Sequence, residues 1–332
     1  MLPAMAHLES LPSRLSSRQA CRSRRLGWVA GLSVALGSVL GTAACGQVAV
    51  IEPETPAAAS QGLVATAGAR LESEVLHASV EVFGIEIATL ESSLCAERDA
   101  GATMQTEVEA APLVKVIRST SGAAKTELLA PGAGPRSSDY TFRDGDIVRH
   151  YQVDYRSGAY AYVYDNGGVE RRTGVNEVPE GAEPHDMHSA LLLLRAWRPR
   201  LDETAHFYVV LGRRPWRVDV TSRGPEMIKL GEQPRLTYRI DGVAVRLDPP
   251  GAEGTPPKRF SLWLSEEAGR VPLRMVADAS FGQVTMTLTG RDASDRNCQR
   301  AVVARGVAPE LRPSARPGLI GTAWSTQRVR RP

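Results

Sequence analysis

One short run of residues, His185-Asp186-Met187-His188, has the residue types of a metal site. Two histidines three positions apart at a helix start can place their rings on one side. A zinc site needs three or four protein ligands, however, and His77, His150 and His206 lie on separate predicted strands. Asp186 also suits a helix N-cap, where a carboxylate accepts hydrogen bonds from free amides. Because capping accounts for the run without a metal, we predict no metal site.

Nucleophilic catalysis has no recognisable motif in this chain. The sequence contains neither a Gly-x-Ser-x-Gly elbow nor a Gly-rich phosphate loop after a strand. The paired carboxylates of Glu266 and Glu267 fall in a predicted turn, where solvation is the usual state. We therefore predict that the protein is not an enzyme and carries no cofactor.

The chain begins with the pattern of an export signal. Five arginines lie within the first 25 residues, and an uncharged apolar run follows from Leu26 to Leu40. About 15 apolar residues are short for a membrane span, which needs ~20. Residues 1–44 are therefore predicted to be a cleaved export leader.

Cys45 follows the small residues Gly41 to Ala44, an arrangement that resembles the lipobox of bacterial lipoproteins. In a lipobox the cysteine thiol takes a diacylglycerol group and becomes the new N-terminus. Thr42 departs from that pattern, which usually has a branched aliphatic residue there, so ordinary cleavage after Ala44 is the alternative. Residues 45–72 are rich in Pro, Ala and Ser and suit a flexible tether. We predict lipid attachment at Cys45 and membrane association through it.

The two ends of the chain carry much of its positive charge. The whole chain has a net charge of +3, but without the leader and the basic, Pro-rich residues 300–332 the remainder is about −7. An acidic remainder argues against a nucleic-acid surface, which needs a basic face. The tail has no apolar period and is predicted to be disordered; weak attraction to anionic lipid headgroups is the alternative.

Two cysteines, Cys95 and Cys298, remain in the folded region once Cys21 leaves with the leader and Cys45 is assigned to the anchor. Thiols in an exported domain meet an oxidising compartment, where pairing is the usual outcome. We predict a Cys95–Cys298 disulfide that closes a loop of about 200 residues. Two free buried cysteines are the alternative.

One helix and many short strands must position these residues. The stretch Pro184–Pro199 predicts a helix over about 186–198, begun by Asp186 and ended by Pro199. At 100° per residue its apolar side chains cover an arc of about 160°, which is broad for a half-buried helix. The arc comprises Met187, Ala190, Leu191, Leu193, Leu194 and Trp197, and it excludes Arg195. A wide apolar surface must cover this helix.

Alternating apolar residues with turn signals about every ten residues predict short strands through residues 73–299, a single antiparallel β domain. One such pattern spans Leu113 to Thr120, and Asp241-Gly242 has the composition of a turn. Near Gly84 the apolar set changes face, which indicates a bulge or a tight turn. We predict a mainly β fold: a curved antiparallel sheet, a half-barrel or open barrel, wrapped around one central helix.

Six of the eight tyrosines lie between Tyr140 and Tyr164. Tyr160, Tyr162 and Tyr164 alternate along one strand and share one face. Such a ladder either fastens a sheet through cross-strand aromatic pairs or lines an apolar pocket. The candidate pocket residues are Tyr160, Tyr162, Tyr164, Leu191, Leu194 and Trp197.

Several segments resemble a bacterial exported-protein family known as domain of unknown function 3108. They are the run LWLSEEAGRVPLRMVADASFGQVTMTLTG from Leu262 to Gly290, the helix start Asp186 to Leu191 followed by Arg195, and VEVFGIEIATLE from Val80 to Glu91. The resemblance covers roughly residues 76–290. It implies an exported, mostly antiparallel β domain in the Gram-negative envelope, similar in outline to lipoprotein-carrier half-barrels of the LolA and LolB type. It assigns no catalytic residues.

Two functional classes follow from these patterns. In the first, a periplasmic lipoprotein attached to the outer membrane binds a lipid or another hydrophobic ligand between sheet and helix. In the second, the anchored domain is a structural or interaction module with a filled core, recognised by other envelope proteins. The similarity to carrier folds favours the first class. An apolar cavity of at least about 300 Å³ would distinguish it from the second.

Overall fold

A computed structural model describes residues 61–63, 72–97, 101–117, 120–129, 134–248, 254–267, 269–279, 282–293 and 298. The predicted leader, Cys45 and the predicted disordered tail lie outside these residues. Within the described ranges, no helix has the length and apolar character needed to cross a membrane.

The described chain is mainly β, with two helices among its strands. Its first half contains β1 (Gln61–Gly62), β2 (Glu74–Val82), β3 (Ile85–Glu97), β4 (Gly101–Ala110), α1 (Pro112–Ile117), β5 (Thr120–Leu128), β6 (Pro135–Asp144), β7 (Ile147–Arg156), β8 (Ala159–Asn166) and β9 (Arg171–Glu177). Its second half contains β10 (Pro184–His185), α2 (Met187–Ala196), β11 (Thr204–Leu211), β12 (Arg214–Leu230), β13 (Gln233–Arg246), β14 (Lys258–Ser265), β15 (Pro272–Ala279) and β16 (Gly282–Ala293).

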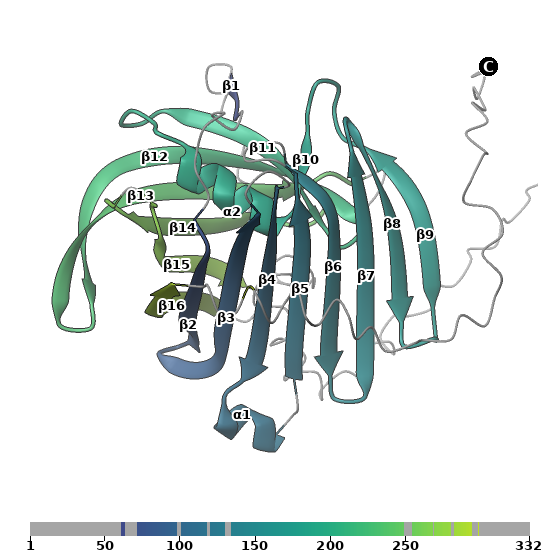
Figure 1. Cartoon of the computed structure of the whole chain (residues 1–332), viewed down its shortest axis with the longest axis horizontal. Helices are drawn as coiled ribbons and strands as arrows, with labels where there is room; N and C mark the ends of the chain where they lie inside the picture. Colours follow the sequence, from purple (N-terminus) through teal and green to yellow (C-terminus); the bar gives the residue numbers. More distant parts are fainter. Residues whose placement is uncertain are drawn as a thin grey trace, which may run out of the picture.

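The strands form one large open sheet in the order β1-β11-β12-β13-β14-β15-β16-β2-β3-β4-β5-β6-β7-β8-β9, with β10 also paired to β11. The pairings are antiparallel except those of β1 and β10, which both run parallel to β11. In Figure 1, β2 to β9 stand as one layer and β12 to β14 cross behind it. The prediction of a mainly β, mostly antiparallel fold is confirmed.

A tight turn accounts for the change of face near Gly84. Val82 and Ile85 pair directly, and the two residues between them have positive φ, 53° at Phe83 and 75° at Gly84. Two successive left-handed residues suit a two-residue hairpin because their twist matches that of the flanking strands. The segment Val80 to Glu91 is therefore a hairpin of β2 and β3.

The prediction of a strand over Leu113–Thr120 is wrong, because α1 occupies Pro112–Ile117 and β5 begins at Thr120. Proline suits the first helical position, where its missing N–H has no partner to lose and its φ is already helical. The amides of Val114 and Lys115 both donate to the Ala111 carbonyl at 2.9 Å. A run this short is compatible with both the two-residue period of a strand and the 3.6-residue period of a helix, and the proline favours the helix.

The predicted turn at Asp241-Gly242 is also wrong, because both residues lie inside β13, where Gly242 pairs with Val220 of β12. A Cβ on Gly242 would fall 2.1 Å from Cζ of Phe260 on β14. The glycine therefore makes room for an aromatic ring above the strand. The chain reverses instead at Gly231, where φ is 59°.

Helix α2 packs against two parts of the sheet. On one side Ala190, Leu193, Leu194 and Trp197 belong to a buried cluster with residues of β11 to β14, among them Phe207, Trp216, Ile240 and Leu264. On the other side Leu191 and Leu192 pack against Leu94, Ala102, Met104 and Leu128 of β3 to β5. Contacts on both sides explain why the apolar arc of this helix is so broad.

Part of the predicted tether is attached to the sheet. Gln61 and Gly62 pair with Ala205 and His206 of β11, and the Leu63 amide donates to the His206 carbonyl at 2.9 Å. The Leu63 side chain packs against the buried cluster around α2. The tether predicted over residues 45–72 is therefore attached to the sheet at residues 61–63.

Candidate functional site

The most polar part of the interior begins where α2 begins. Asp186 is the N-cap: its Oδ1 accepts a hydrogen bond from the Ser189 amide at 2.8 Å, and Ser189 Oγ accepts one from the Asp186 amide at 3.0 Å. This reciprocal pair satisfies amides that a helix start leaves free. The capping role predicted for Asp186 is confirmed.

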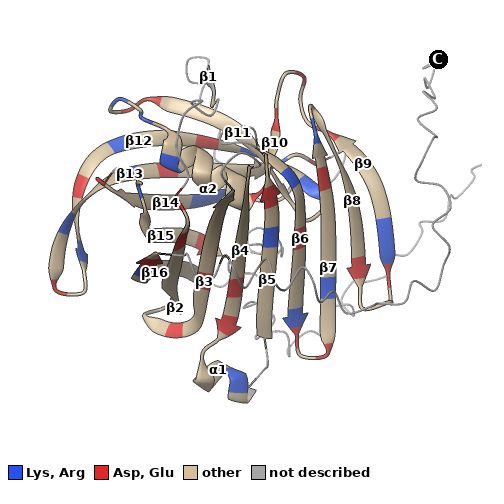
Figure 2. Ribbon diagram, viewed as in Figure 1, with Lys and Arg blue, Asp and Glu red and all other residues tan. Residues whose placement is uncertain are grey.

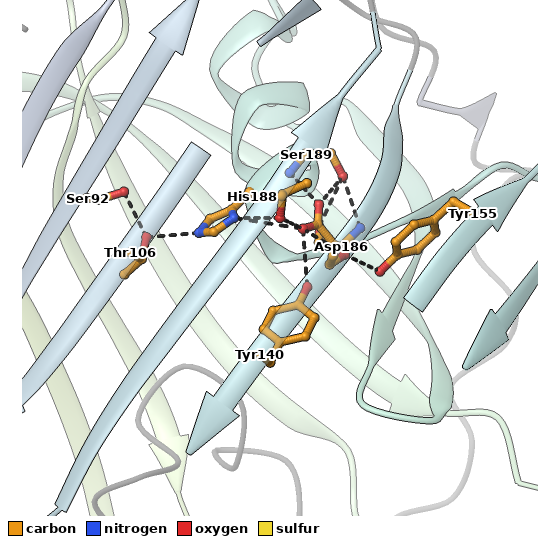
Figure 3. A network of polar contacts seen from close by, with 9 residues as sticks. Ser92, Thr106, Tyr140, Tyr155, Asp186, His188 and Ser189 are labelled. Carbon is orange, nitrogen blue, oxygen red and sulfur yellow. Dashed lines mark hydrogen bonds and ion pairs between the residues drawn. The ribbon is translucent and has the colours of Figure 1, made fainter. Parts of the chain in front are cut away.

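The second carboxylate oxygen of Asp186 faces the sheet, as Figure 3 shows. Oδ2 accepts hydrogen bonds from Thr126 on β5, from Tyr140 on β6 at 3.2 Å and from Ser138 on β6 at 3.4 Å. The Asp186 side chain is fully buried. Both of its oxygens have protein donors, which a buried carboxylate requires.

His188 connects α2 to β4 and β5 through both ring nitrogens. Nε2 lies 2.9 Å from Thr106 Oγ1, and Nδ1 lies 2.7 Å from Thr126 Oγ1. Thr126 donates its one proton to Asp186, so it must accept the proton of His188 Nδ1. Nε2 is then an acceptor for the one proton of the Thr106 hydroxyl, and Thr106 Oγ1 can accept the proton of the Ser92 hydroxyl, 2.9 Å away.

The neutral form of His188 fits this arrangement. Burial lowers the pKa of His188, and the nearby Asp186 carboxylate offsets that effect in part. A neutral ring with its proton on Nδ1 donates to Thr126 Oγ1 and, at Nε2, accepts from Thr106 Oγ1. The imidazole therefore acts in this cluster as one link in a chain of hydrogen bonds.

Tyr140 and Tyr155 border the same carboxylate and stay protonated. Burial, followed by the negative charge of Asp186, raises the pKa of both hydroxyls well above the ordinary value. Tyr140 donates to Asp186, and Ser138 Oγ lies 2.9 Å from the Tyr155 hydroxyl. The cluster is a set of hydroxyl donors around one carboxylate.

This cluster contains residue types that can carry out acid-base chemistry, but its geometry suits a structural role, in which the start of α2 is held to the sheet. Thr126, Asp186, His188 and Ser189 are all buried, and each is bonded to another member of the cluster. His185, the second histidine of the run, packs edge-on to Phe207 with ring centroids 6.4 Å apart. Among the described residues, no group of three or more His, Cys, Asp or Glu side chains could hold a metal ion. The arrangement joins the start of α2 to β4, β5 and β6.

The tyrosine ladder is covered by a turn from the other end of the sheet. The Tyr160 hydroxyl donates to the Arg213 carbonyl at 3.2 Å, in the turn between β11 and β12. Asn176 on β9 donates to both of these oxygens at 3.1 Å. The Arg213 guanidinium lies 5.8 Å from the Tyr164 ring centroid, and Tyr164 stacks on Tyr151 at 4.8 Å. The aromatic face thus holds β11 against β7 and β8.

The candidate pocket residues fall into separate clusters. Tyr160 is buried with Val153, Tyr155, Val178 and Val210, and Tyr162 packs against that group. Leu194 and Trp197 belong to the cluster around α2, with Leu191 packed against it. The structure therefore brings Leu191, Leu194 and Trp197 together, and Tyr160 together with Tyr162, but Tyr164 contacts Tyr151 and Arg213 instead, and the six do not form one cluster.

A family model described as "Protein of unknown function (DUF3108)" matches residues 82–289, more than half of the chain. The chain belongs to this family. The matched range runs from the end of β2 into β16, so it includes α2 and the whole polar cluster. The resemblance noted in the sequence is confirmed. No curated protein matches the chain.

Two solved structures are similar to this DUF3108 chain in outline. One is a beta-barrel-like protein of the domain of unknown function DUF1849 from Brucella abortus, with 11% identity over 68% of this chain and 98% of that chain, at a TM-score of 0.47. The other is a candidate exported protein with a YmcC-like fold from Bacteroides fragilis, with 9% identity over 67% of this chain and 96% of that chain, at a TM-score of 0.31. Likeness at this level carries no functional information.

The predicted disulfide of this DUF3108 protein is present. Cys95 on β3 is bonded to Cys298, with Cα atoms 5.4 Å apart, which is within the usual range for such a bridge. The bond ties β3 to the chain that follows β16, across a sequence separation of 203 residues. Cys45 lies outside the described residues, so its lipidation stays a prediction.

An ion-pair network that sequence reasoning missed holds the last turn of α2. Arg195 Nη1 lies 2.5 Å from Glu74 Oε1 on β2, and the two side chains are 10% and 4% exposed. Glu74 also pairs with Nε of Arg291 on β16 at 3.0 Å, and Arg195 Nε donates to the Gly269 carbonyl at 3.0 Å. Arg195 lies outside the apolar arc, yet it is nearly buried. Its partners are distant in sequence, so no local pattern indicates them.

The carbonyl of Trp197, just after α2, accepts a hydrogen bond from Arg270. The Arg270 guanidinium also lies 4.7 Å from the Tyr238 ring centroid. Burial and then the positive charge of Arg198 lower the pKa of Arg270 to about 10, so it stays charged near neutral pH. A cation at this end suits the negative end of the helix dipole.

Proposed function

We propose that this protein is an exported, membrane-anchored module of the cell envelope whose β domain is non-catalytic and whose interior is filled by its own side chains. The observation that carries the proposal is the packing of the six candidate pocket residues. Tyr160, Leu194 and Trp197 are buried against neighbouring strands, and Tyr164 lies under Arg213. Tyr162 and Leu191 pack against the same clusters.

This packing favours the second functional class over the first. A carrier of a lipid needs its apolar interior for the ligand, whereas here Leu191, Leu193 and Leu194 of α2 are in contact with side chains of the sheet on two sides. In the proposed arrangement the sheet is a half-barrel around the helix, and α2 takes the place that a ligand would occupy. The domain then acts through its surface and its anchor.

The polar cluster also supports a structural role, because its side chains already bond to one another. Asp186 and His188 are bonded to Thr126, Thr106 and Ser189, and all of these residues are buried. A substrate would have to displace α2 from β4 and β5 to reach them. A buried network with its bonds satisfied fixes one packing of helix on sheet.

Native mass spectrometry of the mature protein, purified without added lipid, tests the filled interior. We expect the mass of the chain with its covalent modification and nothing further. A stoichiometric lipid or other hydrophobe that survives gel filtration would contradict a filled core and favour ligand binding. A stearic-acid or phospholipid titration that leaves the unfolding midpoint unchanged would agree with the proposal, because a ligand that binds the folded state raises it.

Membrane anchoring is tested by envelope fractionation of the wild type and of Cys45→Ser. We expect wild-type protein in the membrane fraction and the variant in the soluble fraction after washing, because a serine at position 45 lacks the thiol that carries the lipid and the domain then has no lasting attachment. Mass spectrometry of the N-terminal peptide identifies the acyl group directly. Equal membrane fractions for the two proteins, or an unmodified Cys45 in the wild type, would refute the anchor.

A further inference from the structure

Four large apolar side chains are exposed at one end of the sheet. Phe83 and Ile85, in and beside the β2–β3 turn, are 78% and 58% exposed, and Leu113 and Val116 of α1 are 68% and 85% exposed. We call these four residues the apolar tip. Single exposed apolar residues are ordinary, but a group of large ones on adjacent connections indicates a contact surface.

The two connections that form the apolar tip are neighbours. The Ala111 amide, just before α1, donates to the Ile87 carbonyl on β3 at 2.9 Å. β3 also follows directly from the β2–β3 turn. Figure 1 shows α1 projecting beyond the strand ends, at the same end of the sheet as that turn.

The tip is held in shape by the fold. The Ala111 carbonyl accepts hydrogen bonds from Val114 and Lys115, so α1 is a fixed turn of helix. Val114 is half-buried, and this leaves Leu113 and Val116 outward. Phe83 keeps a φ of 53°, an unfavourable region for a bulky residue, and its ring lies over Gly282, whose added Cβ would be 2.6 Å from Phe83 Cζ. The backbone thus presents the apolar side chains at an apex.

The charge at the tip gives it no attraction for an anion. Lys115 is the charged residue of α1 (Figure 2), and it pairs with Glu109 at 2.8 Å. Glu86, beside Ile85, is exposed. A surface without excess positive charge gains little from phosphate groups, so apolar contact must supply the attraction. A convex apex also buries little area against a flat rigid protein, whereas lipid deforms around it.

The tether allows this contact. Fifteen residues, and so sixteen Cα–Cα steps, separate Cys45 from Gln61, where the chain joins β11. Fully extended, they span up to about 55 Å. The 13-residue strand β3, which runs the length of the sheet away from the tip, is about 40 Å long. A lipid at Cys45 and the apolar tip can therefore reach the same bilayer.

We propose that the apolar tip inserts into the interfacial region of the bilayer that holds the anchor, so that the domain stands on the membrane through α1 and the β2–β3 turn. The partner is a lipid surface, and the inference rests on the proposed membrane anchor. Its consequence is a fixed orientation: the end of the sheet that carries β1 points away from the membrane.

Site-specific fluorescence of the mature, lipid-bearing protein tests the orientation. The Cys95–Cys298 bond and the acylated Cys45 leave a single reactive thiol in Val116→Cys or in the matched control Leu201→Cys, which replaces a residue that is 67% exposed and close to Ala205 on β11, where β1 pairs. Each variant is labelled with an environment-sensitive dye and reconstituted into vesicles of phosphatidylethanolamine with a minor part of phosphatidylglycerol. We expect a blue shift and quenching by brominated lipid at position 116 and neither at position 201.

A second measurement uses the anchor-free Cys45→Ser chain with the same vesicles. Leu113→Ser/Val116→Ser should lower vesicle affinity roughly tenfold or more, because two large apolar side chains no longer leave water on binding. Leu201→Ser, at an exposed position near β1, should leave it unchanged. All three substitutions are at exposed sites, so unfolding midpoints should stay close to wild type.

Three results would overturn the proposal. A label at position 116 that brominated lipid does not quench would show that the tip stays in water. Equal quenching at positions 116 and 201 would show nonspecific adsorption. A blue shift at position 116 that grows with protein concentration without vesicles would show that a second copy covers the tip. An unmodified Cys45 with a quenched label at 116 would instead refute the anchor and leave the tip intact.

Discussion

The ion pair between Arg195 and Glu74 is expected to matter more for stability than its position on the helix suggests. Arg195→Met removes one of the two arginines that pair with the Glu74 carboxylate, which is 4% exposed, and leaves Arg291 at 3.0 Å. Breaking a buried pair costs about 3–5 kcal/mol because the remaining charge stays out of water. Since Arg291 remains, we expect a loss at the lower end, about 3 kcal/mol.

Urea unfolding with the disulfide intact measures this loss. The matched control is Arg217→Met, which removes an exposed pair with Asp219, 2.8 Å apart with side chains 44% and 41% exposed. Exposed pairs contribute about 0–1 kcal/mol, so the control should unfold near the wild-type midpoint. In a thermal scan, 3 kcal/mol corresponds to about 6–12 °C for a domain of this size.

A double variant separates the charge from the packing. Glu74→Gln/Arg195→Met no longer buries a carboxylate, so it should recover most of the stability that Arg195→Met loses. If Arg195→Met and Arg217→Met cost the same within about 0.5 kcal/mol, Arg195 is solvated in solution and the reasoning fails. A double variant as unstable as the sum of the two single variants would also contradict it.

Three further results are expected. Leu194→Ala should lose about 2–5 kcal/mol in urea unfolding as a large-to-small core change, whereas Leu201→Ala, at a residue 67% exposed, should stay within about 0.5 kcal/mol of wild type. The pKa of His188 is lower in the folded than in the unfolded chain, so the unfolded chain binds more protons and the free energy of unfolding should fall as the pH drops below about 6.5. The variant His188→Gln should make this pH dependence less steep. An unchanged slope in the variant would contradict a buried neutral ring at His188. Cys298→Ser should lose up to about 5 kcal/mol, and non-reducing peptide maps of the wild type should contain the linked Cys95 and Cys298 peptides.

Local patterns in the sequence were sufficient for the class of fold and for the limits of the main helix. Alternating apolar residues with frequent turns predict an antiparallel β domain, because period-two burial is a property of the strand itself. Asp186 and Pro199 mark the helix because capping and the effect of proline act over a few residues. The structure has this helix at Met187–Ala196 with Asp186 as its N-cap. The disulfide could be predicted by counting, since two cysteines remained for one bond.

The secondary structure of short ambiguous runs could not be predicted from the sequence. Residues 113–117 are rich in Val, Ile and Leu, as strands often are, but they follow Pro112 and form α1. Asp241-Gly242 is a common turn dipeptide, but here Gly242 lies within a strand and leaves space for the Phe260 ring of a neighbouring strand. In both cases the local preference is weak, and contacts or a single backbone restriction decide between two possible structures.

Only the tertiary structure decided what the buried polar residues do. The sequence singled out Asp186 and His188 but not Thr106, Thr126 or Tyr140, because a threonine or tyrosine on an inward strand position has no local mark of its partner. Those contacts depend on which strands lie beneath α2, and they bring together residues 46 to 82 positions apart. The same holds for Arg195 and Glu74. Burial and pairing of charge are properties of the packed molecule, since they depend on the water that folding removes.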